Sequence, residues 1–514
     1  MRIDASDLDF RRLPGAAPAA VATVTEAQWS SLDEAIHAGG RLVALWGSDR
    51  RPAGEGFVVY AAYAAEDGLA CARLPVSAHR PEYPDLSARF PSAMRMQRAV
   101  FDLLGLEAVG AEDQRAWLRH GAWPADFFPL RHDADPQPAF GNEQERYAFV
   151  SVEGDGVHEI PVGPIHAGII EPGHFRFSIV GEKVLRLEQR LGYVHKGIER
   201  RFVGMPLVEG HRLAGRVSGD STVAYAWAYA MAAEAATGCA IPARASWLRA
   251  LLLERERVAN HLGDLGALGN DGGLAFGLAQ FSRLREQWQR TSAAVFGHRL
   301  LMDRIVPGGV AVDPSPSGLA DMRAQCAEFR SEVSRLRSIY DEHAGLQDRF
   351  LTTGIVTPEL ATQLGLTGLA ARASGWPRDL RVDFPCPPYD QIVVKAAMEL
   401  RGDVAARVAV RFDEIFESLR LIQMLVDDLP DGPVRADLPV LPEPGFGIGW
   451  VEGWRGDVLV AVEVDVEGRL LRCHCHDPSW QNWPLLEHAV IGNIVPDFPL
   501  INKSFNLSYS GHDL

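Results

Sequence analysis

The strongest structural signal in the sequence is a series of long segments whose apolar residues recur with helical spacing. The longest of them are ASWLRALLLERERVANHLGDLGALG (245–269), DMRAQCAEFRSEVSRLRSIYDEHAG (321–345) and GDVAARVAVRFDEIFESLRLIQMLVDDL (402–429). Apolar residues at positions i, i+3 and i+4 give a helix one apolar side that has to be buried. The central part of the chain, from residue 199 onward, is therefore predicted to be a packed group of helices.

Segments typical of β-strands lie on both sides of this helical region. RLVALWGS (41–48) and GFVVYAAYA (56–64) read as strands before it, and residues 92–110 between them and the helical region predict a helix. Residues 146–185 and the segment from Trp454 to Asp477 also indicate β structure.

With 514 residues the chain is too long for one hydrophobic core. A polar segment, residues 134–145, is interpreted as a linker. The predicted fold class is α+β, with a small N-terminal α/β domain at 20–135. A large helix-dominated domain with peripheral β structure follows at 146–514.

Composition excludes several classes of protein. The net charge of −16 disfavours a nucleic-acid-binding role, which requires a basic surface. No run of 18 apolar residues is present, and the charged N-terminus MRIDASDLDFRRL lacks an apolar signal core. We therefore predict a cytoplasmic location, with membrane association through partners only.

Common cofactor motifs are also missing. None of the six cysteines forms a CxxC pair, which argues against an iron–sulfur cluster held by this chain alone. The glycines of GNDGGLAFG (269–277) follow a helix rather than a strand, so this segment is interpreted as a helix end and loop. No Walker A sequence occurs, and neither NAD nor ATP binding is predicted.

Two cysteines and two histidines alternate in CHCH (473–476). In a strand, Cys473 and Cys475 would face one side, and His474 and His476 the other. Each pair supplies two ligands where a structural zinc site needs four, so no metal site is predicted here.

The segment GRVSGDSTVAYA (215–226) has the residue spacing of a metal-binding turn, but serines occupy the positions where metal ligands would be expected. Buried hydroxyl groups without partners cost about 1–3 kcal/mol each. One interpretation is a polar cavity that holds water, a proton path or a small polar ligand. The alternative is a scaffold that has lost its chemistry.

Charged residues occupy an otherwise apolar helix face. Glu254, Arg257 and His261 recur at i, i+3 and i+7 beside Leu251, Val258 and Leu265. They form either a surface ion network or a buried charge relay, because charge on an apolar face must be solvated or paired. Three further residues are candidates to extend a buried relay: Arg244, Arg249 and Asp264.

A second polar segment, RASGWPRDLR (372–381), gathers Arg372, Ser374, Gly375, Asp379 and Arg381. Such a segment is typical of a loop, and the pattern leaves open whether it lines an interior site or an interface.

Several motifs resemble one known family. GPIHAGIIEPGHFRF, LGYVHKGIE, RALLLERERVANHL, VPGGVAVD and IVPDFPLINKSFNLSYSGHDL lie in residues 146–514. This part resembles the family that unites the 49 kDa subunit of respiratory complex I with nickel–iron hydrogenase large subunits, and the membrane-bound, formate-hydrogenlyase-like group looks most similar. MRMQRAVFDLLGLEAVG and PADFFPLRHD make residues 20–135 resemble the 30 kDa subunit of complex I.

The resemblance implies an oxidoreductase setting. Such a subunit docks a small iron–sulfur subunit that carries a 4Fe-4S cluster. It lies on the cytoplasmic side of the inner or plasma membrane, on an arm of antiporter-like proteins. Electron transfer would drive ion translocation, and a quinone is a possible ligand.

The sequence departs from the family at its metal ligands. The four cysteines that hold nickel and iron match Ser218, Ser221, Ser508 and Gly511. Because soft thiolates bind these metals, we predict no metal in this chain and no hydrogenase activity.

The quinone ligands of the family are also replaced. Its histidine matches Ile170, and its tyrosine falls near Gly219. His166, His174 and Tyr225 are nearby substitutes.

The predicted function is that of a peripheral-arm subunit that couples electron transfer to ion translocation without a nickel–iron centre. The alternatives are a non-catalytic subunit that bridges the iron–sulfur subunit and the membrane arm, and a different metal in the same cavity. The candidate cavity residues are His166, Ser218, Asp220, Ser221, Tyr225 and Ser508. The candidate charge network is Glu199, Glu254, Arg257, His261, Asp379 and Arg381.

Overall fold

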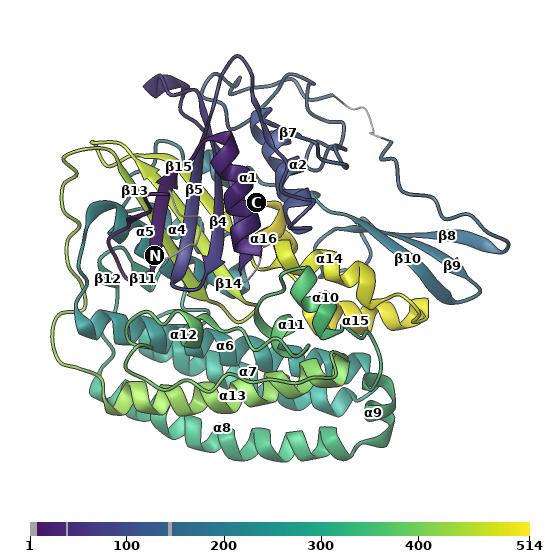
Figure 1. Cartoon of the computed structure of the whole chain (residues 1–514). Helices are drawn as coiled ribbons and strands as arrows, with labels where there is room; N and C mark the ends of the chain where they lie inside the picture. The colour runs from purple at the N-terminus through teal and green to yellow at the C-terminus, as the bar shows by residue number, and fades with distance from the viewer. Residues whose placement is uncertain (1–7, 38–39, 142–145) are drawn as a thin grey trace.

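The protein is described by a computed structural model that covers residues 8–37, 40–141 and 146–514. Four long helices, α6 (Ala243–Asp271), α7 (Ala275–Phe296), α8 (Pro316–Glu342) and α13 (Val404–Asp427), lie side by side below the sheets in Figure 1. They include the three long helices predicted from periodicity. Several small sheets accompany them, and the α+β prediction is confirmed.

The N-terminal part forms a five-stranded sheet in the order β1-β2-β5-β4-β3. Its neighbours pair antiparallel except β2 and β5, which are parallel. A short parallel pair, β6 and β7, and helices α1 and α2 accompany it. The bounds are β1 (Arg11–Arg12), β2 (Ala19–Thr23), α1 (Glu26–His37), β3 (Arg41–Asp49), β4 (Phe57–Ala65), β5 (Gly68–Val76), β6 (Glu82–Pro84), α2 (Ala93–Leu104) and β7 (Glu107–Val109).

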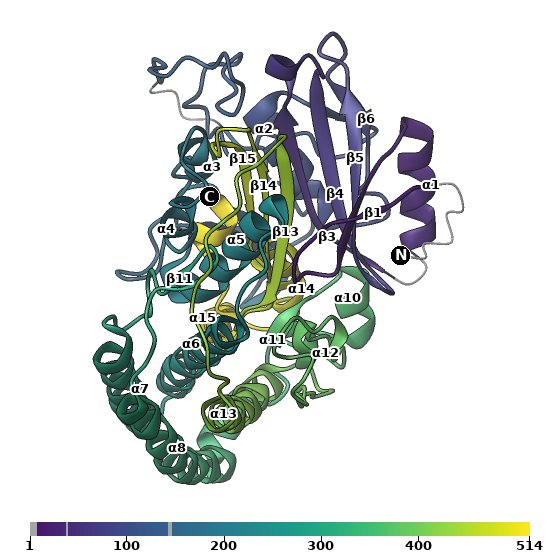
Figure 2. The same ribbon diagram turned by 90° about the vertical axis from the view of Figure 1, so that its left-hand side faces the viewer.

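A second sheet, β13-β14-β15, lies between the N-terminal sheet and helix α5 (Thr222–Thr237), as Figure 2 shows. Its strands are β13 (Gly445–Glu452), β14 (Asp457–Val464) and β15 (Leu470–His476). Helix α5 is rich in alanine and buried on all sides, which allows close packing on the sheet. A side chain at Gly447 or Gly449 would collide with carbonyl oxygens of α5, so glycine is needed at both positions.

The remaining elements surround this centre. A three-stranded sheet of β8 to β10 projects from the body in Figure 1, and a small pair of strands precedes α8. The bounds are β8 (Val157–Val162), β9 (His174–Val180), β10 (Lys183–Arg190), α3 (Ile198–Phe202), α4 (Gly210–Ala214), β11 (Ile305–Val306), β12 (Gly309–Val310), α9 (Ala344–Phe350), α10 (Pro358–Gln363), α11 (Gly368–Arg372), α12 (Leu380–Asp383), α14 (Ser479–Ala489), α15 (Phe498–Phe505) and α16 (Tyr509–Asp513). Three short 3-10 helices are η1 (Arg51–Ala53), η2 (Gly219–Ser221) and η3 (Val495–Asp497).

Two sequence predictions of local structure need correction. The helix expected over 92–110 ends at Leu104, because Gly105 adopts a left-handed conformation and caps it. Strand β13 is missing from the sequence predictions, since its alternating glycines weaken the strand pattern. Of the predicted linker, residues 142–145 lie outside the described residues.

The two predicted domains share hydrophobic cores. One buried cluster combines Trp46 and Tyr60 of the N-terminal sheet with Ile448 and Trp450 of β13. The N-terminal sheet is therefore packed as a layer of the larger body. None of the described helices combines the length and apolarity that a membrane span requires.

Candidate functional site

The serine-containing corner predicted at 215–226 forms where two chain segments meet. Ser218 precedes η2, which leads into the N-terminus of α5. Ser508 is the N-cap of α16, and its Oγ accepts a hydrogen bond from the Gly511 N–H at 2.9 Å. Both serines are buried. The structure thus brings together the two segments that the family resemblance pairs, and we call this site the serine corner (Ser218, Asp220, Ser221, Arg455, Asp477, Ser508).

The hydroxyl groups of the serine corner bond to one another. The Oγ atoms of Ser218 and Ser508 lie 2.9 Å apart. Ser218 Oγ also donates to Asp220 Oδ1 at 2.8 Å. The backbone N–H of Ser508 donates to Ser479 Oγ at 2.9 Å. These contacts give the buried hydroxyl groups hydrogen-bond partners within the protein. Their burial therefore does not require a bound ligand to offset the cost of desolvation.

One ion pair anchors the serine corner. Arg455 binds the Asp220 carboxylate through both Nη atoms, at 2.8 and 2.5 Å, and its Nη1 lies 3.3 Å from Ser221 Oγ. Burial opposes ionisation of Asp220, but Arg455 lowers its pKa overall. Bidentate arginine–carboxylate pairs fix geometry as well as charge, so Arg455 sets the position of the loop that carries Ser218.

A carboxylate fills the space beside Gly511, the fourth position that the resemblance matches to a metal ligand. A side chain added at Gly511 would lie 2.7 Å from Asp477 Cγ and 2.9 Å from Ser508 Oγ, and closer still to an oxygen of Asp477. Tyr225 donates to that same oxygen, Asp477 Oδ2, at 2.8 Å. The four positions therefore offer no thiolate, and Asp477 fills the space beside the fourth. These residues do not fit a thiolate-bound nickel–iron centre.

A second polar cluster lies deeper, and we call it the ion network (Glu254, Arg257, His261, Arg372, Asp379, Arg381, Glu414, Glu452). All of its members are buried. Arg381 joins Asp379 at 2.6 Å and Glu254 at 3.0 Å. Arg372 joins Glu414 at 2.7 Å and Glu452 at 2.8 Å. The interpretation of a surface network was wrong, because these charged residues are buried, as the alternative interpretation expected.

Helix α6 contributes three members of the ion network from one face, as its periodicity predicted. Arg257 lies 3.4 Å from Glu254 and 3.5 Å from Glu414, and His261 Nε2 lies 2.7 Å from Glu414 Oε2. Tyr389 and Ser418 donate to Glu254, each at 2.6 Å. The sequence leaves open whether segment 372–381 lines an interior site or an interface. Its residues Arg372, Asp379 and Arg381 belong to this interior cluster.

The ion network carries one acidic group more than it has arginines. Four carboxyls face three guanidiniums, with His261 as the eighth member. Arg372 and His261 hold the pKa of Glu414 well below its usual range despite burial. Burial raises the pKa of Glu452 to about 7, against the attraction of Arg372. The network can therefore gain or lose a proton near neutral pH.

Residues 452–456, which are the last residue of β13 and the turn to β14, connect the two clusters. Glu452 belongs to the ion network, and Arg257 donates to the Glu452 and Gly453 carbonyls at 2.7 and 3.1 Å. The next residue, Trp454, donates to the Asp220 carbonyl at 2.9 Å and packs edge-on against His261. Arg455 then enters the serine corner. Sequence reasoning missed this turn, although the glycines at 453 and 456 around Trp-Arg mark a tight turn.

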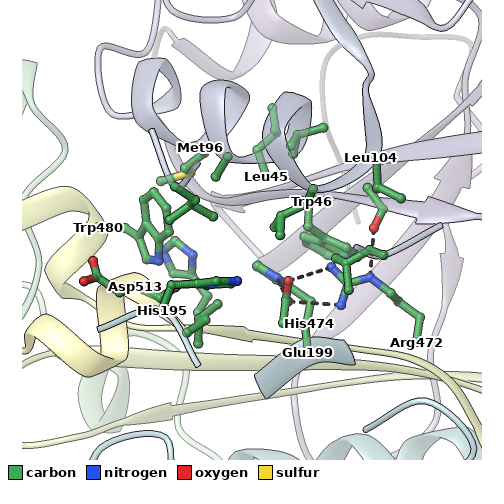
Figure 3. Close-up of a pocket in the computed structure, with 18 residues that line it drawn as sticks. Leu45, Trp46, Met96, Leu104, His195, Glu199, Arg472, His474, Trp480 and Asp513 are labelled. Atoms are coloured by element: carbon green, nitrogen blue, oxygen red, sulfur yellow. Dashed lines mark hydrogen bonds and ion pairs between the residues drawn. The ribbon is translucent and has the colours of Figure 1, made fainter. Parts of the chain in front are cut away.

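Glu199, predicted to belong to the same network, lies elsewhere. It contacts Arg472 at 3.0 Å and His474 at 2.7 Å (Figure 3). Although burial opposes it, these partners lower the pKa of Glu199 to about 2. The group lines a cavity of about 30 Å³ between α2, β3 and β15, with His195 and Asp513 on its polar side. Strand β15 places its cysteines in the core and its histidines toward this cavity, as alternation predicted.

The three residues proposed to extend the relay have separate partners. Arg244 pairs with Asp313 at 2.7 Å, and Arg249 pairs with Glu234 at 2.5 Å. Asp264 binds Arg411 at 2.9 Å and accepts from Asn506 at 2.7 Å. Because the carbonyl of Asn506 accepts from Arg455 at 2.5 Å, Asp264 supports the serine corner instead.

Of the suggested quinone-site substitutes, His166 has an aromatic partner, but it is Tyr509 and not Tyr225. Tyr509 OH lies 3.4 Å from His166 Nε2. Tyr225 is buried and bonded to Asp477. His174 Nδ1 contacts the Gly163 carbonyl at 3.3 Å. His166 lies on the irregular segment between β8 and β9, where Ile169 and Ile170 are exposed.

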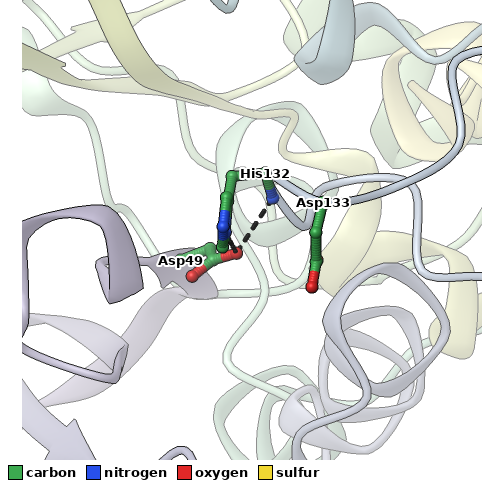
Figure 4. A group of neighbouring side chains, drawn as sticks. All are labelled: Asp49, His132 and Asp133. Carbon is green, nitrogen blue, oxygen red and sulfur yellow. Dashed lines mark hydrogen bonds and ion pairs between the residues drawn. The ribbon is translucent and has the colours of Figure 1, made fainter.

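One group of metal-ligand residue types occurs within the described residues: Asp49, His132 and Asp133 (Figure 4). His132 Nδ1 lies 2.9 Å from Asp49 Oδ2. The guanidinium of Arg51, however, bonds to both carboxylates at 2.7 Å. Arg51 already supplies the positive charge, so this group is a surface ion cluster.

Fold and site together define a class of protein: a helix-dominated body with a buried ion network beside the serine corner, where two distant chain segments meet. Residues 271–445 match the family model of the 49 kDa subunit of respiratory-chain NADH dehydrogenase. Residues 22–139 match the family model of its 30 kDa subunit. Both matches agree with the resemblance seen in the motifs.

Individual relatives narrow this class. The chain is 33% identical over 483 residues to formate hydrogenlyase subunit 5 of Escherichia coli, covering 92% of this chain and 85% of the relative. Hydrogenase-4 component G of the same organism is 32% identical, covering 92% and 84%. The fused C/D polypeptide of the NADH-quinone oxidoreductase of Bacteroides thetaiotaomicron is 28% identical, covering 77% and 78%.

A solved structure shares the fold. The membrane-bound sulfane sulfur reductase, an archaeal respiratory membrane complex, contains a chain with a TM-score of 0.66 and 25% identity. The match covers 70% of this chain and 99% of that one. The protein belongs to the family of large subunits of membrane-bound hydrogenases and complex-I-like oxidoreductases, with the 30 kDa and 49 kDa parts fused in one chain.

Proposed function

We propose that this chain is the peripheral-arm large subunit of a membrane-bound, complex-I-like oxidoreductase that has no nickel–iron centre. The observation that carries the proposal is the closed serine corner. Ser218 and Ser508 bond to each other at 2.9 Å, and Asp477 fills the space beside Gly511. A hydrogen-bonded polar site replaces the thiolate site that hydrogen activation requires.

The subunit acts in coupling rather than in metal chemistry. The turn at 452–456 joins the serine corner to the ion network through Arg257, Glu452 and Arg455. Because Glu452 titrates near pH 7, a change in charge at the corner can move a proton in the network. The chain would dock a small subunit with a 4Fe-4S cluster and an arm of antiporter-like proteins, on the cytoplasmic side of the membrane.

A quinone is the acceptor that the site supports best. Tyr509 follows Ser508 directly, and its hydroxyl group points to His166. This pair offers the histidine and tyrosine that quinone carbonyls need as hydrogen-bond partners. Since the two groups now contact each other at 3.4 Å, the segment that carries His166 would have to move to admit a ring between them.

The test is an electron-transfer assay on the purified complex, with a soluble quinone as acceptor. Glu254→Gln and Asp379→Asn should assemble and lower turnover, because they disturb the buried charges beside the corner. Tyr509→Phe should raise KM for the quinone more than it lowers kcat. No turnover with any donor or acceptor would reject the enzymatic proposal.

A second candidate is a non-catalytic subunit that bridges the iron–sulfur subunit and the membrane arm. The observation that favours it is that the hydroxyls of the serine corner are satisfied internally. It predicts that the double variant Ser218→Ala with Ser508→Ala retains full function. A clear loss of function in a complex that still assembles would exclude this candidate.

A further inference from the structure

Arg255 is a fully buried guanidinium without an acidic partner. It lies on α6, 0% exposed, and packs flat against the Trp288 ring at 4.1 Å. Among the residues that the structure describes, no carboxylate lies within ion-pair distance of it. Burial lowers the pKa of Arg255 to about 10, which still leaves it charged at neutral pH. An unpaired buried charge is costly, so this position calls for a counter-ion.

Neutral acceptors satisfy only part of the Arg255 side chain. Nε and Nη2 donate to Ser292 Oγ at 3.1 and 3.0 Å. Nη2 also donates to the Trp288 carbonyl at 3.0 Å and to Gln325 Oε1 at 3.2 Å. Nη1 is buried and has no hydrogen-bond partner. One strong donor of a charged group is therefore left over.

Arg255 lines a small cavity of about 20 Å³. A cavity of about 10–15 Å³ already admits one water molecule, so this one has room for a single water-sized occupant. Helix α7 contributes Gln289 and Ser292, and the loop after it contributes Arg299. On the other side the cavity reaches Asp220 of the serine corner and its neighbour Gly219. The remaining lining residues are Glu256, Ala259, Asn260, Leu300 and Leu301.

Two other buried arginines show how Arg255 differs. Arg257, two residues along the helix, lies close to Glu254 and Glu414. Arg407 has no carboxylate within ion-pair distance among the described residues, but each of its nitrogens has a fixed acceptor. Nε donates to Ser504 Oγ, and the Nη atoms donate to the Gly402 and Gly354 carbonyls. Of these three, Arg255 alone combines a missing counter-charge with an unused donor and adjoining space.

We propose that this cavity binds a small monovalent anion of halide size, held by Arg255 Nη1 and neutralising the charge of Arg255. The site goes beyond the proposed function and does not depend on it. The anion would tie α6 to α7 and to the loop after α7, directly behind the segment that carries Asp220.

The other charges around the cavity are compatible with an anion. Asp220 is neutralised by Arg455, and Arg299 adds a positive charge although it also contacts Glu286 at 2.6 Å. Glu256 accepts from the Val223 and Ala224 N–H groups, and burial raises its pKa to about 8, so it is mostly neutral at pH 7. The net charge of the residues around the cavity is therefore positive, which favours an anion over a cation.

Bromide is the probe, because its anomalous scattering identifies it in a crystal. Crystals of the full chain soaked in sodium bromide should show an anomalous peak at hydrogen-bonding distance from Arg255 Nη1. A cavity that contains only water, with no bromide peak at this position, would overturn the proposal. This measurement needs no variant.

Solution binding is tested by thermal unfolding of the full chain in increasing sodium bromide. Sodium gluconate, whose monovalent anion is too large for the cavity, keeps the ionic strength constant without the general stabilisation that sulfate would give. A ligand that binds only the native state raises the unfolding temperature with its concentration. Bromide should do so for the wild type and for Arg407→Met, which removes a buried arginine that lacks the cavity. The shift should vanish in Arg255→Met. Equal bromide shifts in all three proteins would contradict a specific site, even if crystals show bromide.

Discussion

The serine corner and the ion network are two buried polar clusters joined by residues 452–456. They differ in the kind of interaction that holds their side chains. The ion network holds eight groups: three arginines, four carboxyls and one histidine. The arginines and carboxyls balance one another's charge through short ion pairs. The serine corner holds small neutral hydroxyls around one ion pair, Asp220–Arg455. Removing a charged partner leaves a bare buried charge in the first cluster, whereas removing a serine hydroxyl in the second costs only its hydrogen bonds. Single substitutions are therefore expected to cost more stability in the ion network than at the serines of the corner.

The sharpest way to break this comparison is Glu414→Gln. The change leaves Arg372, Arg257 and His261 without their shared carboxylate, and breaking a buried ion pair costs about 3–5 kcal/mol. We expect a loss of this size in the free energy of unfolding, measured by chemical denaturation. Asp413→Asn, one residue away, removes a partly exposed pair with Arg337 and should cost less, about 1 kcal/mol. Equal losses would mean that the network is not held by its charges.

The pH dependence of stability separates the clusters next. The pKa of Glu452 is raised from 4.5 to about 7, so its stabilisation is complete below pH 4.5 and is lost as the pH rises through 7. Each pKa unit corresponds to about 1.4 kcal/mol, so this shift corresponds to a total change of about 3–4 kcal/mol. Glu452→Gln should reduce the fall of the unfolding free energy between pH 5 and 8. The part that remains is expected from Glu256, whose pKa is raised to about 8.

Glu254→Gln is the matched control within the same network. Despite burial, Arg381 and Arg257 lower the pKa of Glu254, so its contribution is complete above about pH 6. This variant should lose stability yet keep the wild-type slope between pH 6 and 8. A wild-type slope in Glu452→Gln as well would show that another group titrates.

A pair of glycines tests how tightly the serine corner is closed. Gly511→Ala places a methyl group 2.7 Å from Asp477 Cγ, and overpacking of this kind costs about 1–3 kcal/mol. Gly219→Ala is the control, because a side chain there meets no atom within 4 Å. Thermal unfolding should shift clearly for the first and little for the second. An unchanged unfolding temperature for Gly511→Ala would show that the serine corner can accommodate an added methyl group.

The smallest effect is expected for Ser218→Ala. It removes hydrogen bonds to Asp220 and Ser508, worth about 0.5–1.5 kcal/mol each. A double-mutant cycle with Ser508→Ala, read by chemical denaturation, should give a coupling of about 1 kcal/mol. Strict additivity of the two single changes would contradict the direct contact between the serines.

The two clusters also differ in how far the sequence predicts them. Helical periodicity puts Glu254, Arg257 and His261 on one face, because their spacing is local. Their partners Glu414 and Glu452 come from a distant helix and strand, and no local pattern marks them. The structure decides between a surface and a buried network because burial depends on what packs over the face.

For the serine corner, family resemblance supplies the four positions and their missing thiolates. It does not show that Arg455 and Asp477 close the site, since both lie in a part of the chain whose motifs are ordinary strands and turns. Only the resemblance places Glu199 in the network. The partners of Glu199 are Arg472 and His474 on β15. The sequence pattern suggests the histidines of this strand only as candidate metal ligands.

The measurement that tests the central claim most directly is the metal content of the purified complex, set against the amount of this protein. The closed serine corner predicts no stoichiometric nickel, and iron accounted for by iron–sulfur clusters of other subunits. Stoichiometric nickel in this chain, lost in a Ser218→Ala and Ser508→Ala double variant, would contradict it.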